Sequence, residues 1–293
     1  MTRRLAGAKL ARVESPWIVP PDEQAGSVEA LRQLLALGRV FVLTGAGVST
    51  DSGIPAYRDE SGMWKGRQPI QYRDFVSSAG VRRRYWARSM LGFPLLYRAT
   101  PNRAHHALQT LEKNGALSLL VTQNVDGLHR QAGSENVIDL HGRIDQVRCL
   151  SCATVSERAA LQTELLARNP EFARASATVK PDGDAELTDI DTERFELVDC
   201  PACGGILKPH VVFFGENVPV ERVSRAMSAL AESRLLLIVG TSLMVFSGLR
   251  FARAAARAGI AIAIVNRGVT RADELASLKI AGNVGEILTR ASS

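Results

Sequence analysis

Short apolar strand patterns alternate with amphipathic helix patterns along most of this 293-residue chain. The strand patterns cover 39–44, 116–122, 137–140, 211–214, 235–240 and 260–265. The helix patterns cover 27–38, 101–114, 219–232 and 246–258, and the first is expected to have Ser27 as its N-cap. Strands that alternate with helices of this length favour a parallel sheet with helices on both faces, so the sequence predicts a doubly wound α/β fold.

Two segments interrupt this alternation. Residues 59–100 are rich in arginine and aromatic side chains and lack strand periodicity, so we expect loop and helices there, over the carboxyl edge of the sheet. The stretch from Leu140 to Lys208 holds all the cysteines and an acidic run, which indicates a smaller inserted module. We therefore expect three parts. The sheet domain covers 27–58, 101–141 and 208–290. A helical module with the cofactor loop covers 59–100, and a metal-binding insert covers 142–207.

The four cysteines form two C-x-x-C pairs, Cys149 with Cys152 and Cys200 with Cys203. In a chain without an export signal, such pairs predict metal ligands before disulfides. Each turn brings two thiolates onto one tetrahedral ion, and four thiolates leave zinc no open coordination position. The pattern therefore predicts a zinc site that is structural and not catalytic.

The composition, with 46% hydrophobic and 23% charged residues, is that of a soluble globular protein. No run approaches the roughly 18 apolar residues of a membrane-spanning helix, so we expect no membrane partner. The basic start of the chain, from Arg3 to Arg12, has no apolar stretch after it, which argues against a secretory signal. We expect a bacterial-type cytoplasmic location, with the mitochondrial matrix as the alternative.

The net charge of +6 would by itself allow contact with nucleic acid. A zinc module that binds nucleic acid needs basic and aromatic residues around its cysteines. Residues 182–199, which lead into the second cysteine pair, instead carry eight acidic residues against one arginine. We therefore expect no nucleic-acid partner.

Polar residues and glycines follow several of the expected strands. Gly45 and Gly47 form half of a dinucleotide fingerprint, but Thr50 stands where the third glycine belongs, so a plain tight turn explains them equally well. Asn124 and Asp126 follow a second strand, and His141 follows a third. Each residue taken alone is explained as an ordinary polar residue at the end of a strand. Open α/β sheets bind ligands at these strand ends, however, so the three residues could converge there.

Taken together, these motifs resemble the sirtuins, a family of NAD-dependent protein deacylases, in order and over nearly the whole chain. The segments that carry the resemblance are GAGVSTDSGIPAYR (45–58), TQNVDGLH (122–129), LHG (140–142), the two cysteine pairs, KPHVVFFGE (208–216), GTSL (240–243) and Asn266. The segment 262–288, PDGD (181–184) and FGENVP (214–219) are most similar to the class II branch, which includes mitochondrial sirtuin 4 and bacterial relatives.

The resemblance implies a Rossmann-type NAD domain and a smaller zinc-ribbon and helical domain, with NAD and an acylated lysine meeting in the cleft between them. It implies that the cofactor is held by Gly45, Ala46, Gly47, Ser49, Ile54, Tyr57, Arg58, Gln123, Asn124, Asp126, Gly240, Thr241, Ser242 and Asn266. Among these, Ile54, Asn124 and Asp126 would form the nicotinamide pocket. Ala56 departs from the family, which usually has aspartate there, so the behaviour of the cofactor loop around Arg58 is open.

The resemblance also implies the reaction. Nicotinamide leaves as the acyl oxygen attacks the ribose, His141 acts as the base on a ribose hydroxyl, and Asn124 assists in the nicotinamide pocket. The products are nicotinamide, free lysine and O-acyl-ADP-ribose. The substrate would be an acylated-lysine protein or peptide whose backbone pairs with Val211, Val212, Phe213, Phe214 and Gly215. Protein mono-ADP-ribosylation and lipoamide cleavage are the alternative activities.

The identity of the acyl group is open. Tyr85 and Arg88 have the i, i+3 spacing of residues on one helix face and resemble the pair by which desuccinylating sirtuins hold an acyl carboxylate. The class II resemblance favours long neutral lipoyl-like chains instead, with Leu91 and Phe93 along an apolar channel. A plain solvated face of arginines explains the same spacing without any ligand.

Overall fold

The computed structural model describes residues 24–65, 69–174, 178–179, 185–186 and 192–293. Its larger sheet has six parallel strands in the order β11-β10-β9-β1-β2-β3. The strands are β1 (Val40–Thr44), β2 (Leu117–Thr122), β3 (Val137–Asp139), β9 (Leu235–Val239), β10 (Ala261–Val265) and β11 (Leu278–Ile280). This is the strand order of a Rossmann sheet, whose ligand crevice lies where the order reverses, here between β1 and β9.

The strands at the centre of this sheet are apolar and covered on both faces. Every residue of β1 and of β9 is buried, as the uninterrupted sequences VFVLT and LLLIV predict for a parallel sheet. Thr44 at the end of β1 lies level with Thr122 of β2 and Val239 of β9. The carboxyl ends of three strands therefore open at one edge.

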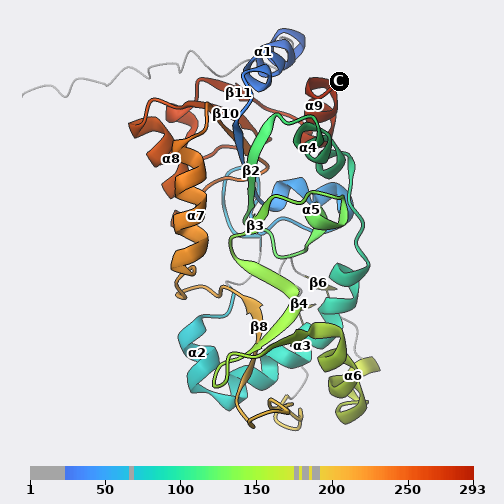
Figure 1. Ribbon diagram of the computed structural model, residues 1–293. Helices are drawn as coiled ribbons and strands as arrows, with labels where there is room; N and C mark the ends of the chain where they lie inside the picture. The colour runs from blue at the N-terminus through green and yellow to red at the C-terminus, as the bar shows by residue number, and fades with distance from the viewer. Residues whose placement is uncertain (1–23, 66–68, 175–177, 180–184, 187–191) are drawn as a thin grey trace, which may run out of the picture.

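Helices cover both faces of the sheet (Figure 1). One face carries α1 (Gln24–Ala36), α4 (Arg103–Lys113) and α9 (Val284–Ala291), which share a core with Val42 and Leu237. The other carries α7 (Val220–Ala231) and α8 (Phe246–Arg257), whose core includes Phe41 and Phe251 with ring centroids 5.6 Å apart. The predicted doubly wound α/β fold is thus confirmed.

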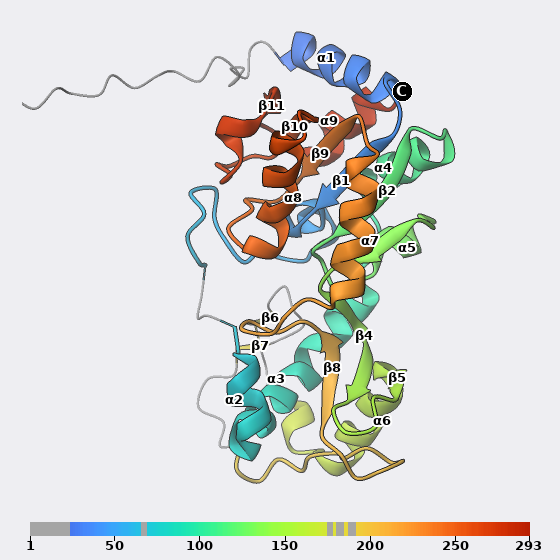
Figure 2. The same ribbon diagram turned by 60° about the vertical axis from the view of Figure 1, so that its left-hand side comes forward.

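The smaller part of the molecule lies below this sheet in Figures 1 and 2. It contains an antiparallel sheet in the order β5-β4-β8 and a hairpin of β6 and β7. The elements are α2 (Tyr72–Ser77), α3 (Ala79–Arg98), β4 (Gly142–Cys149), β5 (Val155–Glu157), α6 (Arg158–Arg168), β6 (Thr178–Val179), β7 (Ala185–Glu186) and β8 (Leu207–Val211). One core joins Phe75 and Trp86 of the helices to Val147 and Leu207 of the strands, so α2 and α3 pack with the cysteine-bearing sheet as one body.

Short elements complete the chain. They are α5 (Leu128–Gln131) and four turns of 3-10 helix, η2 (Ala46–Val48), η3 (Thr50–Ser52), η4 (Phe172–Arg174) and η5 (Asp273–Leu275). Within the described residues, no helix combines the length and the apolar character needed to cross a bilayer. The basic residues Arg3 to Arg12 and the PDGD segment lie outside the described part of the chain.

Two local expectations are wrong. The first helix begins at Gln24, so Ser27 is a buried residue inside it and not its N-cap. The strand expected at 211–214 ends at Val211 and belongs to the antiparallel sheet. The chain leaves that sheet because the N–H of Phe213 donates to the Glu216 carboxylate at 2.8 Å and the carbonyl of Phe214 accepts from the N–H of Tyr72 at 2.8 Å.

Candidate active site

A cavity of about 790 Å³ lies where the carboxyl edge of the parallel sheet faces the smaller part of the molecule. The segments that follow β1, β2 and β9 all contribute to its wall. The wall contains every cofactor residue that the resemblance implies, namely Gly45, Ala46, Gly47, Ser49, Ile54, Tyr57, Arg58, Gln123, Asn124, Asp126, Gly240, Thr241, Ser242 and Asn266. His141 and the five residues 211–215 line it as well.

The glycines after β1 are required by the close approach of two loops. A Cβ added to Gly47 would lie 2.8 Å from the carbonyl oxygen of Gly240, and one added to Gly45 would lie 2.6 Å from Cβ of Thr241. Real side chains do not tolerate such distances. The turn therefore presents bare backbone to the cavity, as a dinucleotide cradle requires.

A chain of hydrogen bonds joins the loops that follow β1 and β2. The Asn124 amide donates to Ser49 Oγ at 3.0 Å, and Ser49 Oγ donates to Asp126 Oδ2 at 2.7 Å. The other carboxylate oxygen of Asp126 accepts from the N–H of Leu128 at 2.9 Å. Burial raises the pKa of the Asp126 carboxyl above its usual value, although these hydrogen bonds oppose the shift. The amide and carboxyl groups are thus fixed before any ligand arrives.

His141 is half-buried in the cavity wall and is held on both sides of its ring. Its Nδ1 lies 2.9 Å from the carbonyl oxygen of Gln123, and its Nε2 lies 2.8 Å from Ser247 Oγ. Burial lowers the pKa of His141 to about 4, and the nearby cations Arg222 and Arg250 act in the same direction. The imidazole is therefore neutral at pH 7 and able to accept a proton.

Residues 55–65 form the loop expected at the cofactor. The Arg58 guanidinium stacks 3.9 Å from the ring centre of Trp64 and donates to the carbonyl of Gly62 at 2.8 Å. Tyr57 packs edge-on against the same Trp64, with ring centroids 6.1 Å apart. Ala56, which replaces the family's aspartate, also faces the cavity. Arg58 is thus engaged within its own loop.

The segment after β8 is held by an ion pair between buried Lys208 and half-buried Glu216. Lys208 is only 4% exposed, and its Nζ lies 2.9 Å from Glu216 Oε2 and 4.4 Å from the ring centre of Phe213. Burial lowers the pKa of Lys208, while the Glu216 carboxylate opposes the shift. The pair fixes the turn that places Phe213 and Phe214 in the cavity wall.

Only one of the two residues proposed for acyl recognition lines the main cavity. Both lie on α3, and Tyr85 lines the main cavity. Arg88 does not line it and instead borders an adjoining hollow of about 290 Å³, together with Tyr85, Asp74 and Arg84. Phe93 is 3% exposed and packs in the core, 4.6 Å below the Arg158 guanidinium.

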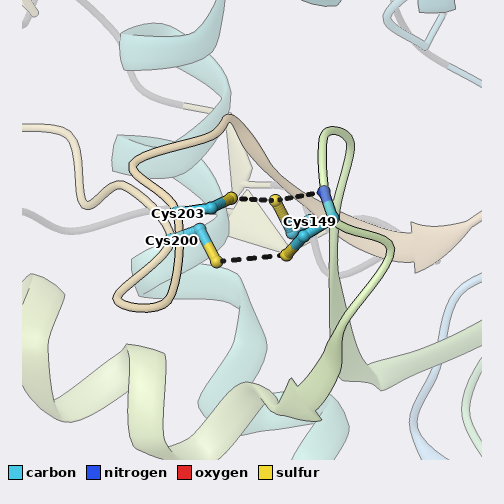
Figure 3. A group of neighbouring side chains, drawn as sticks. Cys149, Cys200 and Cys203 are labelled. Carbon is cyan, nitrogen blue, oxygen red and sulfur yellow. Dashed lines mark hydrogen bonds between the residues drawn. The ribbon is translucent and has the colours of Figure 1, made fainter.

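The four cysteines gather at the far end of the smaller part, away from the cavity. Figure 3 shows Cys149 at the end of β4 and Cys200 and Cys203 on the loop before β8. The sulfur atoms all lie within 4.8 Å of one another, with Cys149 to Cys203 at 3.5 Å and Cys152 to Cys200 at 3.8 Å. Thiolates at about 2.3 Å from a tetrahedral zinc ion are roughly 3.8 Å apart, so this donor set fits zinc.

Two residues of the site were not predicted from the sequence. Ser247 touches His141, and Lys208 braces the aromatic segment. Lys208 begins the KPHVVFFGE motif and Glu216 ends it. A lysine that is buried requires an acidic partner, so the glutamate of the same motif was the available signal. Ser247 has no comparable signal, because its partner lies 106 residues away in the chain.

The sheet, the cavity at its switch point and the cysteine cluster define a nucleotide-binding α/β protein with a zinc-ribbon-like module. A model of the Sir2 family matches residues 45–247. The chain belongs to the Sir2 family. An NAD-dependent protein deacetylase of Bordetella bronchiseptica is 50% identical over 273 residues, which cover 93% of this chain and 100% of that protein. One of Xanthomonas campestris is 54% identical over 250 residues, 85% of each chain.

Solved Sir2 structures share the fold. A Sir2 complex with a p53 peptide and NAD+ superposes with a TM-score of 0.72 at 28% identity and covers 90% of this chain and 96% of that one. A second complex, with a deacetylated p53 peptide and 3′-O-acetyl ADP-ribose, gives 0.72 at 29% identity, with the same coverage of both chains. The family predicted from the motifs is confirmed, and the class II branch stays a prediction.

The buried histidines make stability depend on pH. Burial lowers the pKa of His105 to about 4, lowers that of His141 to about 4 and lowers that of His129 well below its usual value. The unfolded chain therefore binds more protons than the folded chain between about pH 4 and 6.5, and the free energy of unfolding falls as the pH falls through that window. We expect a loss of about 2 kcal/mol from His105 alone between pH 7.5 and pH 5.

Chemical denaturation at these two pH values measures this loss. His105→Gln should show a shallower pH dependence than the wild type, whereas His106→Gln, which removes only the smaller cause of the His105 shift, should change it less. An identical slope in His105→Gln and wild type would contradict the assignment.

Proposed function

We propose that this chain is an NAD-dependent protein lysine deacylase that transfers the acyl group to ADP-ribose and releases nicotinamide. The observation that carries the proposal is the position of His141. A neutral imidazole lies in the wall of the cavity that the dinucleotide motif opens into, and it contacts the carbonyl of Gln123, the residue before Asn124. A base in that place suits proton removal from a ribose hydroxyl. The names of the similar proteins support the same activity.

Different groups in the cavity wall would bind different parts of NAD or exclude water. NAD, when bound, supplies an electrophilic ribose carbon and its own leaving group. The backbone of residues 45–49 and the hydroxyls of Thr241 and Ser242 would hold the diphosphate. Gln123, whose amide donates to Thr241 Oγ1 at 2.9 Å, would face the nicotinamide ribose. Tyr57, Phe213 and Phe214 would exclude water from the reacting centre.

The peptide substrate would enter along residues 211–215. The N–H of Val212 already donates to the His141 carbonyl at 2.7 Å, so the segment is anchored directly beside the base. An acylated lysine on an extended peptide could add to this segment as a strand and place its acyl oxygen in the cavity. We propose acylated-lysine proteins as the substrates on this basis.

Labelled NAD separates deacylation from protein ADP-ribosylation. With NAD labelled in its adenosine half and an acetyl-lysine peptide, deacylation places the label on a small acyl-ADP-ribose and leaves protein and peptide unlabelled. Label retained on the protein, with the peptide still acetylated, would contradict the proposal.

We propose a bacterial-type cytoplasmic location for the activity. The bacterial origin of the similar proteins supports it. Subcellular fractionation with an antibody against the chain tests it, and recovery from a membrane or secreted fraction would contradict it.

We further propose that the cavity accepts acyl groups with a terminal carboxylate. Tyr85 borders both the cavity and the hollow that holds Arg88, so a five-carbon acyl tail that passes Tyr85 would meet a guanidinium. A charge-assisted hydrogen bond contributes about 1.5–3 kcal/mol. Arg88→Met should therefore lower the ratio of kcat/KM for glutaryl-lysine to acetyl-lysine peptides by roughly tenfold or more.

The matched control is Arg84→Met, which removes an exposed arginine from the same hollow and should leave the ratio unchanged. A lipoyl peptide belongs in the panel as the neutral long-chain substrate. No glutaryl preference in the wild type, or the same preference in Arg88→Met, would contradict the role of Arg88.

A further inference from the structure

The two ring nitrogens of His141 have partners of different kinds. Nδ1 lies 2.9 Å from the Gln123 carbonyl oxygen, which can only accept a hydrogen bond. Nδ1 therefore carries the proton, and in the neutral ring Nε2 is an acceptor. The Ser247 hydroxyl, 2.8 Å from Nε2, must then donate to it.

Ser247 is held in place by the start of α8. It is the second residue of that helix, is only 7% exposed and lines the cavity. The next residue, Gly248, packs on the Gln123 side chain so closely that an added Cβ would lie 2.6 Å from Gln123 Oε1. The first turn of α8 thus rests on the same residue whose carbonyl fixes the other side of the imidazole.

The Gln123 side chain is itself held by hydrogen bonds, so the contacts on both sides of the imidazole are fixed. Its amide nitrogen donates to Thr241 Oγ1 at 2.9 Å and to the carbonyl of Thr44 at 3.2 Å. The imidazole is therefore gripped between a strand end of the sheet and a helix start, with a fixed tautomer and a fixed ring plane. Arg222 of α7 and Arg250 of α8 are the cations that act on the ring, and both favour its neutral form.

We propose that Ser247 is a positioning residue for His141. Its hydroxyl holds Nε2 unprotonated and aimed along the cavity wall, so that a ribose hydroxyl can replace Ser247 as the donor and then lose its proton to Nε2. The inference rests on the proposed function of His141 as the base. The start of α8 lies outside every motif that carries the resemblance. The inference gives it a part in the proton-transfer step.

Nuclear magnetic resonance of the histidine-labelled full chain tests the contact without any cofactor. Long-range proton–nitrogen correlations report which nitrogen of each imidazole is protonated, and the spectrum of His141→Ala identifies the His141 signals. We expect a protonated Nδ1 and a hydrogen-bonded, unprotonated Nε2 in the wild type. In Ser247→Ala the Nε2 resonance should move, while the signals of exposed His106 remain in place. A proton on Nε2, or an unmoved Nε2 resonance in Ser247→Ala, overturns the proposal.

Kinetics test the consequence. Exchange of labelled nicotinamide into NAD in the presence of acyl peptide needs the first step but no base. Ser247→Ala should lower deacylation about tenfold and leave this exchange within twofold of the wild type, and Ser247→Thr, which keeps the hydroxyl, should restore deacylation. A parallel loss of both activities in Ser247→Ala overturns the proposal, because it indicates a merely structural residue.

Two further outcomes are decisive. Deacylation that stays low in a Ser247→Thr protein whose Nε2 resonance has returned to the wild-type position also overturns the proposal. A wild-type protein that binds NAD and exchanges nicotinamide without deacylating peptide refutes the proposed function instead, while the resonance comparison still decides whether Ser247 holds the ring.

Discussion

His141→Ala is expected to lower the turnover of deacylation by roughly a hundredfold or more, as removal of a general base does. The affinity for NAD should change little, since the groups expected to hold the diphosphate lie on the loops after β1 and β9 and not on His141. Exchange of labelled nicotinamide into NAD should persist in the variant for the same reason. Steady-state kinetics and calorimetric titration with NAD measure the two effects.

The control for this variant is His106→Ala, which removes an exposed imidazole from α4 and should retain wild-type turnover. Loss of NAD binding in a folded His141→Ala protein would show that His141 organises the cofactor site. Near-normal deacylation by that protein would contradict its role as the base.

Cys200→Ala is expected to abolish zinc binding, the order of the smaller part and activity together. Cys200 is 4% exposed and packs in the core that also contains Phe75, Tyr85 and Phe213. Zinc binding contributes directly to the folding of such modules. Tyr85 and Phe213 also line the cavity. Loss of order at the metal site is therefore expected to extend to the part of the cavity wall that would bind the substrate.

Metal analysis of the wild type should return one zinc ion per chain, and treatment with a strong chelator should reproduce the Cys200→Ala defect. Ser156→Ala, an exposed change on the neighbouring strand β5, serves as the control and should keep both zinc and activity. A stable, active Cys200→Ala protein, or a wild type without zinc, would contradict a structural metal site.

The parallel sheet was predictable because its strands are buried on both faces. The sequences of β9 and β10, LLLIV and AIAIV, contain only apolar residues, and few other structures accommodate such short apolar runs between helices. The antiparallel strand β8 was not predictable in this way. Its sequence LKPHV includes Lys208, whose burial depends on contacts that form only in the folded chain, with the Glu216 carboxylate in the turn after the strand and with the ring of Phe213.

Some residues of the site were likewise predictable from the sequence, and others were not. Asn124, Asp126 and His141 were predictable because each follows a strand, and strand ends of a parallel sheet meet at one edge. The contact between His141 and Ser247 depends on the packing of α8 against the loop after β2, which no local pattern encodes. The separation of Arg88 from the main cavity likewise follows from how α3 packs, since the spacing fixes only a shared helix face.

The stoichiometry of the products shows directly whether the chain is an NAD-dependent deacylase. The chain, NAD and an acetyl-lysine peptide are incubated together, and nicotinamide, free peptide and acyl-ADP-ribose are quantified by mass spectrometry. We expect the three products in equal amounts, with the acetyl group on ADP-ribose. Free acetate formed without consumption of NAD, or consumption of NAD with the peptide still acetylated, would contradict the assignment of this chain as an NAD-dependent deacylase.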